Sequence, residues 1–381
     1  MNFQPLKDFL DGYLPMLGIP GSDTVIYLDH KEIFRYTSGY DNYLIKTPVR
    51  TDALYNIYSC TKISTMVAAA QLIERGEISV LDPVDAYIPE FKDITVKIKD
   101  SDGNVIGSRP PKRPMLIKHL LSMTSGLNYT LIRPEVNDVI EKSGGRAPTL
   151  DVCRALAKAP LEFDPGEHFM YSLSHDVMAG VIEAVTGERF SEYLTENVFH
   201  PLGMYDTEFH PNPEKRHRFA THYAFDPKNG GQIIPFEQTR FRIGTEFDSG
   251  GAGIISSVND YILLMDMLAS GGVGKNGSRI LSPRTIDLMR TNLLTKEQIE
   301  EFTERTSLTG YGYGWGVRTC IDKGIAGNLA SLGQFGWDGW KLCYAFADPE
   351  CKLSFFHAEH MGGYHDVVIP RLRNLVYSCV F

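Results

Sequence analysis

The chain has 381 residues, of which 43% are hydrophobic and 22% are charged, and its formal net charge is −9. This composition is typical of a globular protein whose length suffices for a large core or for two subdomains. The net acidic charge and the lack of a basic arm argue against nucleic acid or an anionic membrane as the main partner, because neither would be attracted to such a surface.

The first ten residues, MNFQPLKDFL, contain no basic segment followed by a long apolar core. They do not resemble a secretion signal, and no window has the apolar length that is needed to span a bilayer. We therefore expect a cytoplasmic protein with no membrane partner. The six cysteines are scattered without a C-x-x-C pair, which favours reduced core thiols over a disulfide framework or a zinc site.

The first 81 residues predict a helix followed by strands. An amphipathic helix is expected over 3–18, where Gly18 and Pro20 end it. Alternating apolar residues then predict strands at 24–28, 32–36 and 53–58. The last of these strands leads into an apolar helix that ends at Gly76.

Residues 82–247 have a mostly helical pattern. It is interrupted by a probable turn sequence, Asp102-Gly103-Asn104, which predicts a hairpin over 96–106. The clearest helices are expected at 117–122, 150–158, 175–186 and 190–198.

The last third of the chain returns to strands. A helix is predicted at 258–268 and another from Pro283, with a Gly-rich hairpin between them. Strands are expected at 314–320, 342–347 and 353–358, and a final helix near 367–377.

The order of strands, helices and strands predicts an α+β fold in which the early and late strands join one antiparallel sheet. The sheet domain would be discontinuous, comprising residues 1–81 and 248–381, and residues 82–247 would form an inserted, mostly helical subdomain. An active site is expected in the cleft between the two parts.

The strongest chemical signal is the segment Tyr58-Ser59-Cys60-Thr61-Lys62 at the start of a predicted helix. Residues three apart on a helix share a face, so the Ser59 hydroxyl and the Lys62 amine can lie within hydrogen-bond distance. The first helical turn also offers unpaired N–H groups and the positive end of the helix dipole, which favour negative charge near Ser59. A buried Lys62 would lose its proton more readily than in water, and could then deprotonate Ser59. The motif alone is short enough to occur by chance, so the rest of the sequence must decide whether it marks an active site.

Further segments occur in the order found in one enzyme superfamily. They are LLSMTSGL at 120–127, FDPGE at 163–167 before Tyr171-Ser172, PLGM at 201–204, SGGAGIISSVND at 249–260 and GYGYGWG at 310–316. With Ser59 and Lys62, they make nearly the whole chain resemble the serine β-lactamase and penicillin-binding-protein superfamily, in the branch of class C β-lactamases, D,D-peptidases, esterases and acyltransferases. The resemblance implies a β-lactamase/D,D-peptidase-like fold that needs no cofactor and no metal.

The resemblance also implies roles for single residues. Ser59 would be the acylated nucleophile and Lys62 its proton-transfer partner. Tyr171 would be the phenol or phenolate that shares the base role and protonates the leaving group. A phenol loses its proton near pH 10, so Lys62 would have to lower the pKa of Tyr171 for it to act as a base near neutrality.

The third motif of the superfamily maps to Gln334-Phe335-Gly336, followed by Trp337. The oxyanion hole would then consist of the backbone N–H groups of Ser59 and Trp337. Gly336 would let the strand pass close to the substrate without a side chain. The aromatic residues Phe335, Trp337, Trp340, Tyr311 and Tyr313 would suit an apolar acyl or alcohol group, or simply pack in the core.

Two departures from the superfamily pattern decide the predicted substrate. Leu173 stands where the pattern has an Asn that binds a substrate amide, and Gln334 and Phe335 replace the cationic Lys that meets a carboxylate. Losing a charge-assisted contact costs about 1.5–3 kcal/mol. The residues expected to contact the substrate are Leu173, Gln334, Phe335, Gly336 and Trp337.

We therefore predict a serine hydrolase or acyltransferase that acylates Ser59 from a carboxylic ester, or from a thioester or simple amide. One alternative is a D,D-peptidase or weak β-lactamase, and another is a catalytically inactive binding protein. The acyl acceptor, which could be water or a second alcohol or amine, and the oligomeric state stay open.

Other motifs give weaker signals. Residues 272–277 match G-x-G-x-x-G, but they follow a helix, so we interpret them as a hairpin loop and not as a dinucleotide site. His357, His360 and His365 lie near acidic residues, but two of these histidines are expected at the surface or rim, and no metal is predicted. The absence of a G-x-S-x-G elbow excludes the α/β-hydrolase fold.

Overall fold

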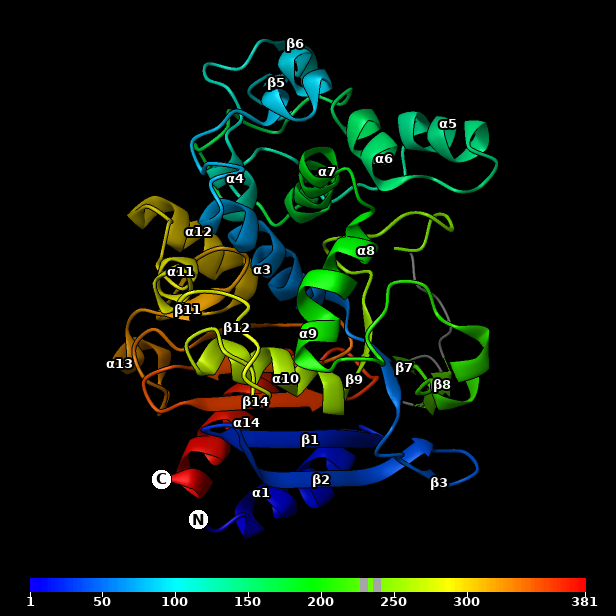
Figure 1. The fold of residues 1–381 in the computed structure, drawn as a ribbon, viewed down its shortest axis with the longest axis vertical. Coiled ribbons are helices and arrows are strands. Elements are labelled where there is room, and N and C mark those ends of the chain that lie inside the picture. The colour runs from blue at the N-terminus through cyan, green and yellow to red at the C-terminus, as the bar shows by residue number, and fades with distance from the viewer. Residues whose placement is uncertain (227–231, 236–240) are drawn as a thin grey trace.

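An eight-stranded antiparallel sheet forms the centre of the molecule in the computed structural model, which describes residues 1–226, 232–235 and 241–381 (Figure 1). The strand order is β10-β11-β12-β13-β14-β1-β2-β3. These strands are β1 Gly21–Leu28, β2 Lys31–Asn42, β3 Thr47–Pro48, β10 Tyr311–Tyr313, β11 Arg318–Cys320, β12 Phe335–Asp338, β13 Tyr344–Asp348 and β14 Leu353–Ala358. β1 pairs with β14 from Asp23 opposite Ala358 to Leu28 opposite Leu353. The prediction that early and late strands share one antiparallel sheet is confirmed.

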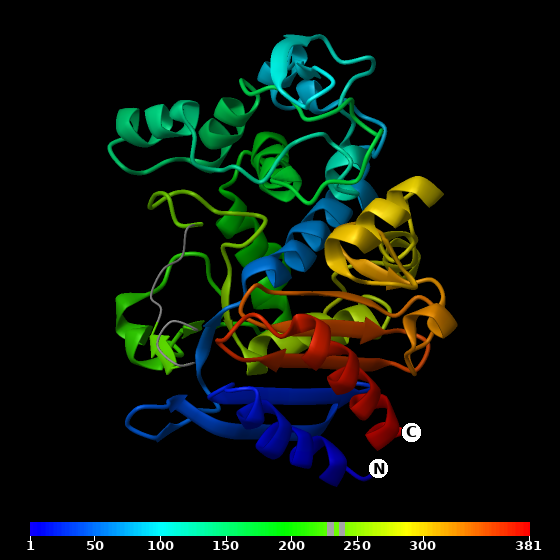
Figure 2. The same ribbon diagram turned by 180° about the vertical axis from the view of Figure 1, so that it is seen from behind.

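The sheet has a core on each face because its central strands are apolar on both sides. Val25 of β1 and Phe356 of β14 belong to one core. Their chain neighbours Ile26 and Phe355 belong to the other core. Successive side chains of a strand point to opposite faces, which produces this division. One core lies against α3 (Thr61–Glu74) and α10 (Val258–Ala269), and the other lies against the N- and C-terminal helices (Figure 2).

The N- and C-terminal helices pack together on the outer face of the sheet. The predicted helix over 3–18 consists of α1, a π-helical turn and α2, and the last helix is α14. Their bounds are Gln4–Asp8, Phe9–Tyr13, Leu14–Met16 and His365–Val380. Figure 2 shows both terminal segments in front of the sheet when it is seen from behind.

Between the early and late strands, the described residues of 82–247 contain short helices, two hairpins and long connecting loops. Their helices are α4 Ile117–Leu121, α5 Pro134–Lys142, α6 Thr149–Leu156, α7 Ser174–Thr186, α8 Phe190–Leu194 with a π-helical turn Thr195–Phe199, and α9 His200–Leu202. Short 3₁₀ turns occur at Val84–Ala86, Pro89–Asp93 and Pro213–Arg218. The hairpin expected over 96–106 is formed by β5 Val96–Lys99 and β6 Val105–Arg109, and a second one by β7 Tyr223–Asp226 and β8 Gln232–Pro235. The division into two domains at residues 82 and 247 stays a prediction.

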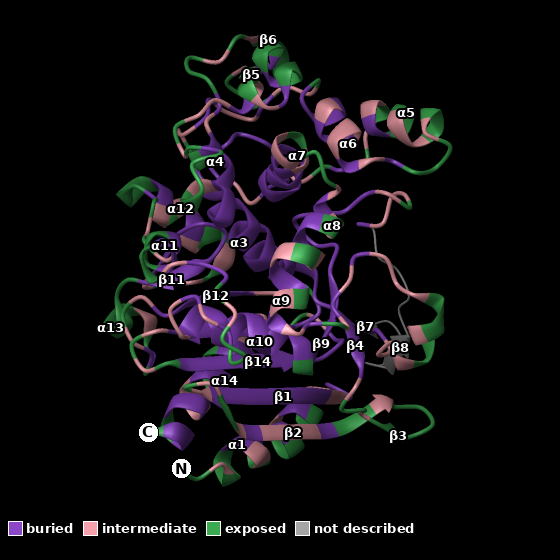
Figure 3. Ribbon diagram, in the orientation of Figure 1, coloured by how far each residue is buried: buried purple, intermediate pink, exposed green. Residues whose placement is uncertain are grey.

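Helix α3 runs through the middle of the molecule (Figure 3). Every residue from Thr61 to Leu72 is buried, and the helix contains the sequence Val67-Ala68-Ala69-Ala70. A helix that is apolar on all sides is buried on all sides, and small alanines allow neighbouring helices to approach it closely. The first turn of α3 is therefore held rigidly, and this turn directly follows Ser59.

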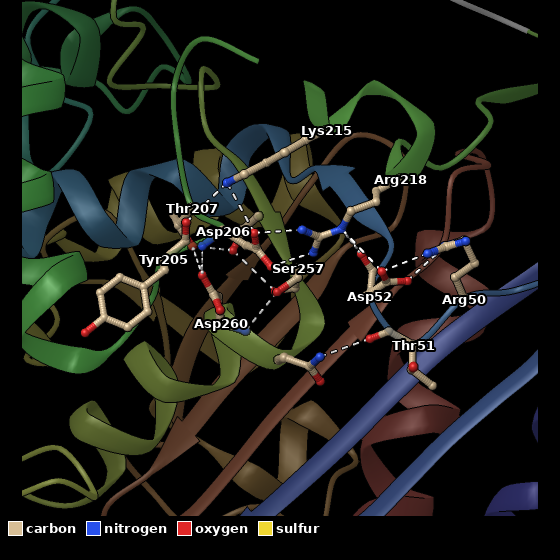
Figure 4. Close-up of polar contacts among 12 residues, drawn as sticks. Arg50, Thr51, Asp52, Tyr205, Asp206, Thr207, Lys215, Arg218, Ser257 and Asp260 are labelled. Atoms are coloured by element: carbon tan, nitrogen blue, oxygen red, sulfur yellow. Dashed lines mark hydrogen bonds and ion pairs between the residues drawn. The ribbon is translucent and has the colours of Figure 1, made fainter. Parts of the chain in front are cut away.

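The short strand before Ser59 is anchored by a polar network (Figure 4). This strand, β4 Leu54–Asn56, pairs with β9 Ile255–Ser257, which leads into α10. Arg218 donates to Asp206 at 2.8 Å between Nη1 and Oδ1 and to the Asp52 carbonyl at 2.9 Å. Asp260 in turn accepts from the Asp206 N–H at 2.7 Å. The network ties the segment before β4 to the start of α10.

Two predicted elements differ from the structure. Of the strand expected at 314–320, only residues 318–320 form a strand, β11, whereas 314–317 are the turn between β10 and β11, because the Gly314 N–H donates to the Val317 carbonyl and Gly316 has a φ of 65°. The strand expected at 53–58 stops at Asn56, since Tyr58 has a φ of 45° and begins the turn of Ser59. Helices α11 Pro283–Met289, α12 Lys296–Thr306 and α13 Lys323–Ala326 complete the fold.

Within the described residues, no helix is both long enough and apolar enough to cross a membrane. The Gly-rich segment at 272–277 is a hairpin loop, as predicted, with Gly274 donating to the Ser278 carbonyl at 2.9 Å. All six cysteines are free thiols.

Candidate active site

Ser59 lies in a tight 3₁₀ turn, Tyr58–Cys60, that joins β4 to α3. Tyr58 has a left-handed backbone conformation, which is strained for a residue with a side chain and persists only where the surroundings hold it. Its ring packs edge-on against Trp340, with 5.5 Å between ring centroids, and against Phe241. The strained turn holds Ser59 at the N-terminus of α3, as the sequence predicted.

Lys62 and Tyr171 both contact the Ser59 hydroxyl. The buried Lys62 donates from Nζ to Ser59 Oγ at 3.2 Å, and Tyr171 donates its hydroxyl to the same atom at 2.8 Å. Trp337 Nε1 in turn donates to the Tyr171 oxygen at 3.2 Å. Tyr171 comes from the loop before α7 and Trp337 from β12, so the structure brings together residues from three distant parts of the chain.

The electrostatics of the site favour Lys62 as the base. Burial lowers the pKa of Lys62 to about 8, although the negative charge of Asp176 opposes this shift. A neutral amine is thus accessible near physiological pH. Burial raises the pKa of Tyr171 well above its usual value. Tyr171 is therefore a neutral hydrogen-bond donor, which differs from the sequence-based expectation that Lys62 would lower its pKa.

The buried carboxylate of Asp176 is linked to Lys62 through the backbone of Gly251. Lys62 Nζ donates to the Gly251 carbonyl at 2.7 Å, and the Gly251 N–H donates to Asp176 Oδ1 at 3.3 Å. Ser249 Oγ donates to the same Asp176 oxygen at 2.5 Å. A side chain at Gly251 would lie 2.6 Å from Asp176, so only glycine permits this approach. Asp176 thus fixes the turn that holds Lys62, and sequence reasoning did not single it out.

Replacing Asp176 by asparagine should move the pH dependence of the reaction. Because Lys62 must be neutral to accept a proton, kcat/KM is expected to rise with pH and to level off above about 8, the pKa of Lys62. Without the Asp176 charge, protonated Lys62 is less favoured, and the rising limb should shift to lower pH. Ser249→Ala is the control, because it removes a hydrogen bond to Asp176 but keeps the charge. An unshifted limb in Asp176→Asn would show that the carboxylate does not act on Lys62.

Ser59 opens into a cavity of about 500 Å³ whose lining includes both aromatic and charged side chains. The aromatic lining residues are Tyr58, Tyr129, Tyr171, Phe241, Trp337 and Trp340. Tyr171 is stacked between Tyr129 and Trp337, at centroid distances of 5.4 and 5.8 Å. Such flat rings suit an apolar acyl or alcohol group. Of the aromatic residues named from the sequence, Trp337 and Trp340 line the cavity, whereas Phe335, Tyr311 and Tyr313 are buried beside it.

Four of the five residues expected to contact the substrate do not line the cavity. Leu173 directly precedes α7 and is packed in the core, while Gln334, Phe335 and Gly336 are buried within or beside β12. Trp337 alone of the five faces Ser59 and Tyr171. The Trp337 indole, directly after the segment predicted from the sequence, is therefore the side chain of β12 that lies beside Tyr171 in the cavity of Ser59.

The end of β12 reaches the nucleophile turn. A side chain at Gly339 would lie 2.3 Å from the Ile57 carbonyl, so glycine is required there. The Gly339 N–H donates to the Cys343 carbonyl at 2.6 Å, and Trp337 lies opposite Ala345. Hydrogen-bonded pairs alternate in an antiparallel ladder, which directs the Trp337 N–H toward β13. The expected Trp337 donor of the oxyanion hole stays a prediction, and this register favours the amide of Trp340, which lines the cavity.

The histidines near the C-terminus do not form a metal site. Two of the three histidines were expected at the surface or rim, but His357 and His360 are both buried, and burial lowers the pKa of His357 to about 3. His365 lines the cavity and bonds through Nε2 to the Gly339 carbonyl at 2.9 Å. Among the residues that the structure describes, no group of three or more His, Cys, Asp or Glu side chains could hold a metal ion.

Known proteins share this fold and sequence. Esterase EstB of Burkholderia gladioli is 29% identical, with 92% of this chain and 88% of its own length covered. Acyltransferase calJ of Penicillium decumbens is 27% identical, with 95% and 89% covered. Among solved structures, EstCE1, a hydrolase with promiscuous acyltransferase activity, superposes with a TM-score of 0.75 and 25% identity over 98% of this chain and 96% of its own.

The model of the family described as Beta-lactamase matches residues 6–357, which include Ser59, Lys62, Tyr171 and the whole of β12. The chain belongs to the beta-lactamase family.

Proposed function

We propose that this protein is a serine hydrolase or acyltransferase that forms an acyl-enzyme on Ser59 from a carboxylic ester. The observation that carries the proposal is the Ser59 hydroxyl, which accepts hydrogen bonds from both Lys62 and Tyr171 at the wall of an aromatic cavity. The relatives named an esterase, an acyltransferase and a hydrolase with acyltransferase activity support it.

In the acylation step, Ser59 Oγ would attack the ester carbonyl carbon while its proton passes to Lys62 Nζ. Backbone N–H groups of Ser59 and of the end of β12 would stabilise the oxyanion. When the bond to the leaving alkoxide breaks, Tyr171 would donate its proton to that oxygen and regain one from Lys62. Water or a second alcohol would then attack the acyl-enzyme by the same steps in reverse.

An ester is a better fit than a penicillin or a peptide. The Trp337 indole is uncharged and donates to Tyr171, so it cannot pair with a substrate carboxylate beside the nucleophile. Gln334 is buried and its side-chain amide has no partner, so a Lys introduced there would bury a charge instead of entering the cavity. A D,D-peptidase or a weak β-lactamase stays the alternative.

The proposal is tested by comparing turnover of 4-nitrophenyl butyrate with turnover of a penicillin. We expect ester hydrolysis that depends on Ser59 and a penicillin rate that is lower by about one to two decades, the value of one missing charge-assisted contact. Adding a simple alcohol in excess should yield the transesterified product if the acyl-enzyme accepts alcohols. Rapid penicillin hydrolysis with no ester turnover would favour the alternative. The cytoplasmic location expected from the sequence stays a proposal that cell fractionation would test.

A further inference from the structure

One face of α14 forms a wall of the active-site cavity. Asp366, Ile369, Pro370 and Arg373 all line it. Their spacing of three, four and seven residues places them on the same side of the helix. α14 packs on the face of the sheet opposite to α3 (Figure 2), so this wall is distinct from the one that carries Ser59.

Arg373 on this wall is buried without a counter-charge. Its side chain is 2% exposed, and Nε and Nη1 are buried with no hydrogen-bond partner. No ion pair of Arg373 occurs within the described residues. Its guanidinium lies over the Tyr311 ring, 5.1 Å from the centroid, and near the Tyr344 phenol, and neither residue is a carboxylate that would balance its charge. Arginine stays protonated in proteins, so the cavity wall contains an unbalanced cation.

A second buried arginine of the same region shows what a purely structural arrangement looks like. Arg318 is fully buried, yet Nη1 bonds to Asp338 at 3.2 Å and Nη2 to the Ala345 carbonyl at 3.3 Å. The fold therefore supplies Arg318 with a carboxylate partner, although its Nε, like that of Arg373, has no hydrogen-bond partner. Burying a charge is costly unless it is paired, and Arg373 lacks the partner that Arg318 has.

The remaining charges around the cavity leave this cation available to a ligand. Asp338 is already paired with Arg318, and its other oxygen lies 3.8 Å from His365. Asp366 lies two helical turns before Arg373 and forms no ion pair with it within the described residues. Arg305, at the end of α12, adds a second and exposed cation to the lining.

We propose that Arg373 is the centre of a subsite for an anionic group, a carboxylate or a phosphate, carried by the ester that acylates Ser59 or by the alcohol that accepts the acyl group. The inference rests on the proposed function and extends it by naming a substrate class. A guanidinium presents parallel N–H donors that match the two oxygens of a carboxylate or phosphate. The aromatic walls near Ser59 would hold the apolar part of the same molecule.

The test compares matched anionic and neutral esters. One pair has the charge on the acyl side, for example a mono-4-nitrophenyl ester of a dicarboxylic acid and its monomethylated form, in a series from adipate to sebacate. The other pair has the charge on the alcohol side, as in acetylated hydroxy acids and the methyl esters of these acids. We expect kcat/KM of the wild type to favour the anionic member of at least one pair by about tenfold or more, as one charge-assisted hydrogen bond allows. Arg373→Met should abolish the preference, so that the ratio of kcat/KM between the anionic and the neutral ester of each pair falls to about one.

Arg371→Met is the matched control, because Arg371 is an exposed residue of the same helix. This substitution changes the net charge by the same amount as Arg373→Met. It should retain the preference, and Arg373→Lys should retain part of it. A wild type without preference in either pair, or a preference that survives in Arg373→Met, would overturn the proposal.

A binding measurement separates this inference from the proposed chemistry. Adipate or inorganic phosphate should raise the Tm of wild-type protein and of Arg371→Met but not that of Arg373→Met, whether or not any ester is turned over. The ligand that gives the shift distinguishes a carboxylate from a phosphate. Equal shifts in all three proteins, or none in the wild type, would contradict an anion subsite at Arg373.

Discussion

Replacing Ser59 by alanine should lower kcat for ester hydrolysis by about 10⁴-fold or more, since removing the nucleophile of an acyl-transfer enzyme leaves only binding and oxyanion stabilisation. KM should change little, because the cavity walls are formed by other residues. Initial rates with 4-nitrophenyl esters of increasing chain length measure this loss.

The matched control is Cys60→Ala, which changes the neighbouring residue. Cys60 is fully buried, and burial raises the pKa of its thiol well above the usual value, so it is a poor nucleophile. Activity should persist in this variant, apart from a cost in stability. If Ser59→Ala remained active and Cys60→Ala did not, the assignment of the nucleophile would be wrong.

Replacing Tyr171 by phenylalanine should lower kcat by about 10²- to 10⁴-fold, the usual contribution of a general acid. The change removes the hydroxyl that donates to Ser59 Oγ and would protonate the leaving group, but it keeps the ring between Tyr129 and Trp337. The loss should be larger for alkyl esters than for nitrophenyl esters, because nitrophenolate leaves without a proton. Comparing the two ester classes in one variant measures this difference.

Tyr313→Phe provides the control for Tyr171. Tyr313 is also buried and packs edge-on against Trp337, but its hydroxyl has no hydrogen-bond partner and it does not line the cavity. We expect nearly wild-type kinetics from this variant. Equal losses for alkyl and nitrophenyl esters in Tyr171→Phe would mean that Tyr171 positions Ser59 and does not protonate the leaving group.

The parts of the site that could be predicted from the sequence lie in short segments with local constraints. Ser59 and Lys62 share one helical turn, and Tyr171 follows a recognisable loop. The third motif was placed at 334–336, whereas the side chain that faces Tyr171 is Trp337. A shift of one residue reverses the face of a strand, and local composition does not reveal which face a short strand turns to the cleft. Glycine is required at both Gly336 and Gly339, but a side chain at Gly336 would meet the Ala345 carbonyl, whereas one at Gly339 would meet the Ile57 carbonyl next to the nucleophile turn.

Some missed elements had usable signals. Thr295 and Gln298 form a capping box at the start of α12, and a T-x-x-Q pattern of this kind predicts a helix start. Pro134 at the first position of α5 is a similar signal. By contrast, the two glycines at 314 and 316 broke a strand that the apolar pattern favoured.

The contacts that need tertiary structure could not be predicted. Asp176 acts on Lys62 through the Gly251 turn, 75 residues further along the chain. Tyr129, Phe241 and Arg373 meet at one cavity although they come from separate loops and a terminal helix. Sequence spacing predicts which residues share a helix face. It does not predict which distant helix or strand packs against that face.

Intact-protein mass after brief exposure to 4-nitrophenyl butyrate, followed by peptide mapping, tests the central claim most directly. The account predicts a butyryl adduct on the peptide that contains Ser59, formed as fast as nitrophenol is released in the first turnover and absent in Ser59→Ala. It also predicts that Tyr171→Phe acquires the adduct more slowly. Ester turnover with no adduct at Ser59, or an adduct elsewhere that Ser59→Ala retains, would contradict it.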